Sequence, residues 1–204
     1  MPLGAHKAAL FGVAGVSTGS AVLLETAVAS DDASIEFTLP TAYKQVKFGF
    51  NVTPATDGAI LQFQVNASDD VGGDFDESLI TSTFFHAHQK ETGTDATLEY
   101  RTGSDQAQGT GYQHLVSDSG TGNDADQSCA GELFLFSPQS TVYVKHFYAR
   151  THNYMPHPTV GHDWATDAYV GGYINNAASA ISEISFKMSS GNIDDGTIKM
   201  WGIK

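Results

Sequence analysis

The stretches VKFGFNV at 46–52 and ILQFQVN at 60–66 decide the fold of this chain. In both, apolar residues stand two positions apart, which matches a β-strand because its successive side chains point to opposite faces. The turn-forming sequence PATDG at 54–58 separates them. No segment carries an apolar stripe with the 3.6-residue period of a helix. The pattern predicts an all-β protein whose strands each have one face in water.

The same alternation recurs along most of the chain, with segments rich in Gly, Asp, Asn and Ser between the strands. Many short strands punctuated in this way are typical of an antiparallel β-sandwich or jelly roll. We expect about a dozen strands in one domain spanning residues 20–204, and a longer irregular loop at 149–167. The predicted strands are 21–29, 34–39, 46–52, 60–66, 81–88, 96–101, 112–116, 131–136, 141–148, 168–174, 181–188 and 197–203.

The charge balance excludes some partners. The 204 residues include 10 Lys and Arg against 23 Asp and Glu, a formal net charge of -13. Phosphate backbones and anionic membrane surfaces repel such a chain, so we expect no nucleic-acid partner. No stretch approaches the length of a membrane span, so we expect no membrane insertion. The single Cys129 excludes an internal disulfide, and its apolar strand predicts a buried or half-buried thiol.

Residues 1–19 are rich in Gly and Ala and form a predicted extended arm that would lie along a neighbouring subunit. The apolar side chains in this arm are the candidate assembly residues, because burying them between copies would stabilise an oligomer. They are Leu3, Leu10, Phe11, Val13 and Val16.

The predicted loop at 149–167, with the end of the strand before it, gathers aromatic, histidine and acidic residues. Flat apolar rings beside fixed polar groups are what a carbohydrate or partner site needs, so these residues form a candidate ligand-binding site. The alternative is a packed loop or a subunit contact. The candidate residues are Tyr148, His152, Tyr154, His157, His162, Asp163 and Trp164.

Histidines also suggest a metal. His86 and His88 are spaced to lie on one face of a strand, and four further histidines fall between 146 and 162. No HExxH or equivalent motif defines their geometry, so we expect ordinary surface or interface histidines, no metal site and no cofactor. No nucleophile elbow or phosphate-binding loop occurs either. We therefore expect a protein without enzymatic activity, and a metal-dependent hydrolase is the least favoured alternative.

Four segments carry a resemblance to a known family: MPLGAHKAALFGVAGV at 1–16, SIEFT at 34–38, PATDG at 54–58 and the closing ISEISFKMSSGNIDDGTIKMWGI at 181–203. The last predicts two strands joined by a turn, with the terminus packed into a sheet. Together they resemble small jelly-roll-like virion structural proteins of marine tailed phages.

The resemblance implies a homo-oligomeric component displayed on the virion surface, either a capsid decoration or cement protein or a fibre or appendage subunit. Its partners would be other virion proteins of the capsid or tail. The alternative function is a lectin-like module that recognises host surface glycan through the aromatic and histidine loop.

Overall fold

The computed structural model describes residues 20–67, 75, 77–93, 95–156, 164–176 and 178–204. These residues form thirteen strands, and no helix occurs among them. The strands are β1 Ala21–Asp32, β2 Ile35–Thr38, β3 Gln45–Pro54, β4 Leu61–Ala67, β5 Ile80–Lys90, β6 Ala96–Tyr100, β7 Ala107–Gly109, β8 Gln113–His114, β9 Cys129–Phe136, β10 Lys145–Met155, β11 Trp164–Ile174, β12 Ile181–Met188 and β13 Ile193–Ile203.

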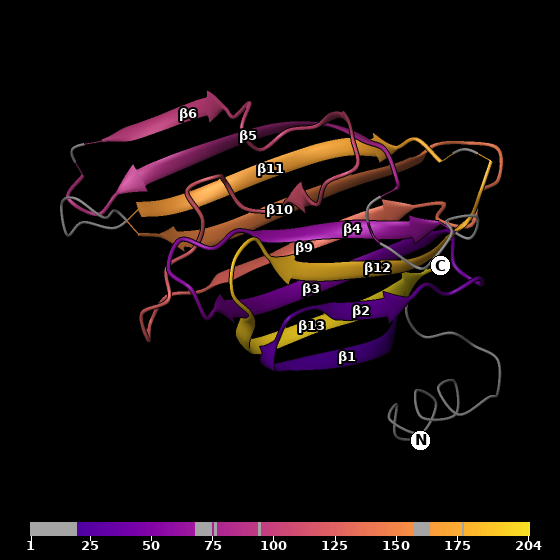
Figure 1. Cartoon of the computed structure of the whole chain (residues 1–204), viewed down its shortest axis with the longest axis horizontal. Helices are drawn as coiled ribbons and strands as arrows, with labels where there is room; N and C mark the ends of the chain where they lie inside the picture. Colours follow the sequence, from indigo (N-terminus) through magenta and orange to yellow (C-terminus); the bar gives the residue numbers. More distant parts are fainter. Residues whose placement is uncertain (1–19, 68–74, 76, 94, 157–163, 177) are drawn as a thin grey trace, which may run out of the picture.

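The strands form two antiparallel sheets that pack face to face. The larger sheet has nine strands in the order β1-β13-β3-β9-β10-β11-β5-β6, with β7 also paired to β5, and the smaller has the order β2-β12-β4-β8. Figure 1 shows the smaller sheet over the middle of the larger one, which spans the molecule from β6 to β1. The prediction of an all-β sandwich is confirmed. This strand order does not establish the finer jelly-roll topology, in which eight strands form two Greek keys.

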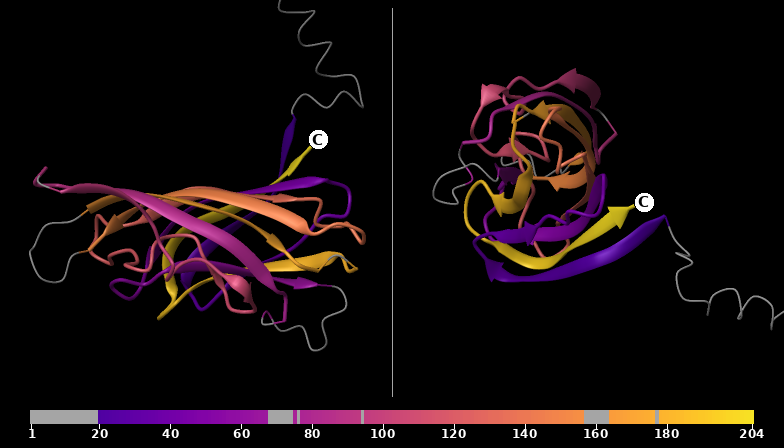
Figure 2. Two further views of the ribbon diagram at one scale, coloured as in Figure 1. Left: turned by 90° about the horizontal axis from the view of Figure 1, so that it is seen from above. Right: turned by 90° about the vertical axis from the view of Figure 1, so that its right-hand side faces the viewer.

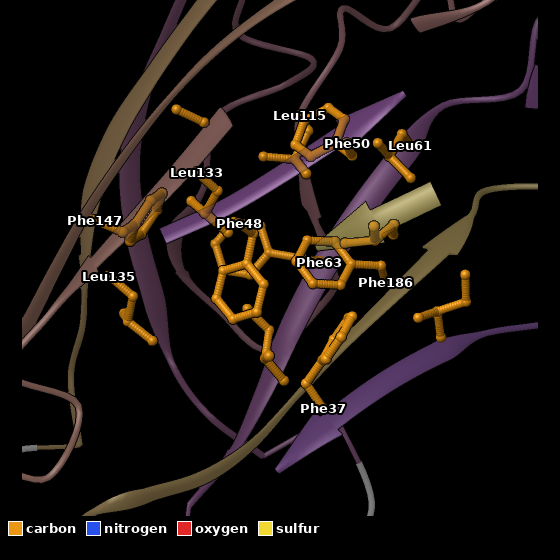
Figure 3. Packing of buried hydrophobic residues seen from close by; sticks show 14 of the residues in the cluster. Phe37, Phe48, Phe50, Leu61, Phe63, Leu115, Leu133, Leu135, Phe147 and Phe186 are labelled. Atoms are coloured by element: carbon orange, nitrogen blue, oxygen red, sulfur yellow. The ribbon is translucent and has the colours of Figure 1, made fainter. Parts of the chain in front are cut away.

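The core lies between the two sheets, as Figure 3 shows. Phe48 of β3 in the larger sheet packs against Phe37 of β2 and Phe186 of β12 in the smaller one, with ring centroids 5.6 and 5.3 Å apart. Phe63 of β4 meets Phe147 of β10 edge-on at 5.1 Å. Tilted and edge-on aromatic pairs of this kind add to the burial of their surface. One hydrophobic cluster therefore joins both sheets.

Strand β4 differs from the predicted pattern because both of its faces are buried. The prediction that its polar residues face water is wrong. The Gln64 amide is buried and donates to the carbonyls of Ser78, Thr110 and Gly111 at 2.8–3.1 Å. The chain around residue 110 thus covers the outward side of β4, and Gln64 satisfies its carbonyls. A buried polar group needs such partners.

The prediction of an irregular loop at 149–167 is wrong for its described residues. β10 runs on to Met155, and β11 begins at Trp164 and pairs with β10 along its whole length. The alternation was hard to detect because three of the inward positions of β10 hold Ala149, Thr151 and Asn153. Thr151 Oγ1 donates to the Leu115 carbonyl at 2.6 Å, and Asn153 Nδ2 to that of Gly120 at 2.7 Å. At these two inward positions of β10, hydrogen bonds to the segment that contains Leu115 and Gly120 thus take the place of apolar packing.

The last two strands also differ from the prediction of a closing hairpin. β12 pairs with β2 and β4 in the smaller sheet, whereas β13 pairs with β1 and β3 in the larger one. The turn between them therefore carries the chain from one sheet to the other. The expectation that the terminus packs into a sheet is confirmed, since Ile203 pairs with Ala21 and Gln45. Figure 2 shows the ends of β1 and β13 extending away from the body.

Candidate functional site

The side of the nine-stranded sheet that faces away from the smaller sheet is the candidate functional surface, called here the outer face. Alternation along β10 defines it: Phe147, Ala149 and Thr151 are buried, while Tyr148 and Arg150 between them are exposed. His146, Tyr148, Arg150 and His152 on this side of β10 are all exposed, so no described element buries them. The central strands of a large sheet thus present side chains to solvent.

A row of large side chains crosses the outer face in register. Trp201 of β13 lies opposite Lys47 of β3, Lys47 opposite Phe134 of β9, and Phe134 opposite Tyr148 of β10. The Lys47 ammonium lies 5.2 Å from the Phe134 ring centroid and 6.0 Å from that of Trp201. Phe134 and Tyr148 stack with centroids 4.9 Å apart and planes at 22°. Tyr148 nevertheless remains 46% exposed.

A second row of side chains lies two residues further along β10 and continues across β11, β5 and β6. The Arg150 guanidinium lies 5.3 Å from the Tyr169 ring, and Tyr169 stacks on Phe85 of β5 at 5.1 Å with planes at 8°. Phe85 is 42% exposed and pairs in register with the exposed Tyr100 of β6. Stacked aromatic rings with cations beside them make a flat surface with apolar rings. The two cations are each paired with a carboxylate, Lys47 with Glu132 and Arg150 with Asp167. Aromatic residues and arginine are the types enriched at protein interfaces.

An open groove of about 500 Å³ lies beside these rows. Its lining includes Leu98 of β6, His152 of β10 and Asp167 of β11. Asp167 accepts a hydrogen bond from Arg150 Nη2 at 2.9 Å, which holds the carboxylate at the groove wall. This hydrogen bond also raises the pKa of Arg150. The groove therefore joins an apolar edge to a histidine and a fixed acid.

The structure separates the residues of the predicted ligand site. Tyr148 and His152 are exposed on the outer face, and Tyr154 follows them there, half-buried, with its hydroxyl donating to Glu91 Oε1 at 3.3 Å. Trp164 points to the opposite side and is only 8% exposed. The predicted residues outside the described ranges are His157, His162 and Asp163, together with the predicted arm at 1–19 and its assembly residues Leu3, Leu10, Phe11, Val13 and Val16.

The buried side of the same strands brings together side chains of the kind that hold a metal ion. His86 and His88 share the inner side of β5, as their spacing predicted, and Glu99 of β6 lies opposite His86 in the register. The His86 Nε2 to Glu99 Oε1 distance is 2.9 Å, and His88 Nδ1 lies 3.4 Å from His86 Nε2. The Trp164 ring stands edge-on to His88 at 4.4 Å. Sequence reasoning missed Glu99 because only strand pairing places it there.

Two pKa shifts describe this cluster. Burial is the main cause that lowers the pKa of His88, with the neighbouring His86 acting in the same direction. The hydrogen bond from His86 is the main cause that lowers the pKa of Glu99. At neutral pH the His88 ring is therefore neutral and the Glu99 carboxylate ionised.

The lone thiol is buried in the core rather than in either surface. Burial raises the pKa of Cys129 to about 12, so the thiolate is disfavoured at physiological pH. The prediction of a buried thiol is confirmed.

Within the described ranges, the chain forms no helix with the length and apolar character needed to traverse a bilayer. Comparisons with protein-family models, with curated proteins and with solved structures found no match to this chain.

Proposed function

We propose that this chain is a non-enzymatic structural protein of a tailed-phage particle, displayed on the particle surface, which acts by association through its outer face. One observation carries the association: stacked aromatic pairs stand on strands of the nine-stranded sheet, and Phe85 and Tyr148 in these pairs remain 42% and 46% exposed. Exposed apolar patches on a folded domain mark interaction sites. The phage particle is proposed from the resemblance of the segments at 1–16, 34–38, 54–58 and 181–203 alone.

The edge of the sheet favours copies of the same chain as partners. β1 is twelve residues long, and among the described strands it pairs only with β13, which makes it an edge strand of the described sheet. Its side chains Leu23 and Val28 are exposed. A long edge strand with exposed apolar side chains pairs readily with another strand. Two copies meeting at β1 would extend the sheet, a mode of association separate from contact through the aromatic rows on β10 and β5.

Removing the two stacked pairs on the outer face tests association. We expect the full-length wild type to be oligomeric by size exclusion with light scattering, and Phe85→Ser with Tyr148→Ser to weaken its dissociation constant by about tenfold or more, because exposed aromatics at interfaces are frequent hot spots. The matched control is Tyr143→Ser, since Tyr143 is 72% exposed in the β9–β10 connection and away from the outer face.

Circular dichroism and thermal melting verify that the variants are folded. A wild type that stays monomeric at all concentrations, or an oligomer that the double variant leaves unchanged, would count against association through this face. A chain lacking residues 1–19 separates the two modes of association, because loss of the oligomer in that chain alone would assign it to the predicted arm.

A second candidate, binding of host surface glycan, is favoured by the groove. Its wall offers His152 and Asp167 for sugar hydroxyls beside the apolar Leu98. We expect His152→Ala to weaken binding to host cells and to an array of bacterial surface polysaccharides by about tenfold, the effect of losing one or two strong hydrogen bonds.

His146→Ala is the control for the glycan test, because His146 lies exposed on the same face of β10 but not in the groove. Equal binding by both variants would rule out this use of the groove. Trp164→Ala is unsuited to the test, because Trp164 is buried on the inner side.

A further inference from the structure

Three potential metal ligands converge at the β6 end of the larger sheet, on its inner side. They are Nε2 of His86, Nδ1 of His88 and a carboxylate oxygen of Glu99, and they all lie within 4.8 Å of one another. His86 is fully buried, His88 is half-buried, and the Glu99 side chain is 38% exposed. One side of the cluster is thus anchored in the protein while the other opens to solvent.

The distances suit a small transition-metal ion. Tetrahedral coordination with bonds of about 2.0–2.1 Å places neighbouring ligand atoms about 3.3 Å apart. The His86 Nε2 to Glu99 Oε1 separation is 2.9 Å and the His86 Nε2 to His88 Nδ1 separation is 3.4 Å, so these two pairs need shifts of only a few tenths of an ångström. The third pair, His88 with Glu99, lies within 4.8 Å. Two imidazoles with one carboxylate form a ligand set that zinc and neighbouring divalent metals accept.

No placement of protons gives all three of these atoms a suitable hydrogen-bond partner. If His86 Nε2 carries the proton, it donates to Glu99, and His88 Nδ1 then faces a nitrogen with no free lone pair. If His86 Nε2 is bare, it faces the Glu99 carboxylate at hydrogen-bond distance without a proton between them. A cation at the centre would accept all three lone pairs together.

The surroundings hold the ligands and balance their charge. Arg101 Nη1 donates to Glu99 Oε1 at 2.9 Å, and the same guanidinium pairs with Asp118. Arg101 thus orients the Glu99 carboxylate, while Asp118 pairs with the same guanidinium and offsets part of its charge. On the other side, Trp164 packs edge-on against the His88 ring and restricts its orientation. Groups that orient the ligands in this way are a usual part of metal sites.

We propose that His86, His88 and Glu99 bind one divalent transition-metal ion of the zinc type, with at least one coordination position left to water. The ion would tie β6, which among the described strands pairs only with β5, more firmly to β5. The site lies on the opposite side of the sheet from the outer face, so its presence does not depend on the proposed association.

Titration of the metal-free, tag-free full-length chain tests the site. We expect calorimetry with Zn²⁺ to give one site per chain, and Co²⁺ to give the visible absorption of a nitrogen- and oxygen-ligated ion. His88→Gln and Glu99→Gln should each weaken the Zn²⁺ affinity by about 100-fold, because each removes one of three ligands. Zn²⁺ should also raise the melting temperature of the wild type and not that of His88→Gln.

The controls are His152→Gln on the outer face and a double variant, His157→Gln with His162→Gln. Both should bind Zn²⁺ as the wild type does, and circular dichroism verifies that every variant is folded. Absence of saturable binding at micromolar Zn²⁺ would overturn the proposal. So would binding that survives both His88→Gln and Glu99→Gln, or that is lost only in the 157 and 162 double variant.

Discussion

Replacing Phe48 with alanine is expected to lower the free energy of unfolding by about 3–5 kcal/mol, the range for large aromatic residues in well-packed cores. Phe48 is fully buried and is the ring of the larger sheet that contacts both Phe37 and Phe186 of the smaller one (Figure 3). Alanine would leave a cavity between the sheets. The strands around it cannot close the cavity, because each is held in register by its neighbours in the sheet.

Urea unfolding followed by circular dichroism measures this loss. Phe48→Leu should cost less, since leucine fills most of the space. Tyr143→Ala, a change at an exposed aromatic residue, should stay within about 0.5 kcal/mol of the wild type. All chains are compared at one protein concentration, because association also stabilises the folded state. If Phe48→Ala unfolded at the same urea concentration as Tyr143→Ala, the packing between the sheets would be wrong.

Replacing Gly196 with alanine is expected to be comparably destabilising, for a backbone reason. Gly196 of β13 has φ +118°, a conformation that costs a residue with a Cβ about 1–3 kcal/mol. A Cβ at this position would also lie 2.2 Å from the Asn51 carbonyl oxygen and 2.7 Å from the Val52 Cα of β3. These are backbone atoms, so the paired strands β13 and β3 would have to separate. A register shift in the β13–β3 pairing falls next to this position, between Ile193 and Asp195.

Gly93→Ala is the matched control, because Gly93 also has a positive φ, of +71°, but a Cβ there would meet nothing within 4 Å. Its cost should therefore be limited to the backbone term of about 1–2 kcal/mol. Thermal and urea unfolding of both variants measure the difference. Equal stability of the two variants would show that β13 does not approach β3 as closely as the structure places it.

Strand positions were predicted well where the inward residues are large and apolar. The alternating stretch at 46–52 became β3, Gln45–Pro54, and the stretch at 60–66 became β4, Leu61–Ala67. The prediction stopped too early in β10, because Thr151 and Asn153 occupy inward positions there. Their hydrogen bonds reach the carbonyls of Leu115 and Gly120, more than thirty positions away along the chain. No local pattern carries that information.

The candidate site was likewise predicted where the spacing of neighbouring residues decides it, and mispredicted where strand pairing decides it. Period-two spacing correctly placed His86 and His88 on one side of a strand, and it puts Tyr148 and His152 together on the outer face. Grouping Trp164 with them assumed a loop, and the strand register places its side chain on the inner side instead.

By itself, the sequence determined the all-β class, most of the strands, the acidic character and the burial of Cys129, because alternation, turn residues and charge are properties of neighbouring residues. Only the tertiary structure decided which strands pair and which face of each is covered. β1 pairs with β13 across most of the length of the chain, and β12 and β13 enter different sheets despite the short turn between them. Glu99 meets His86 through the register of β6 on β5. These contacts join residues far apart in the sequence, so they depend on how all the strands pack together and not on any one segment.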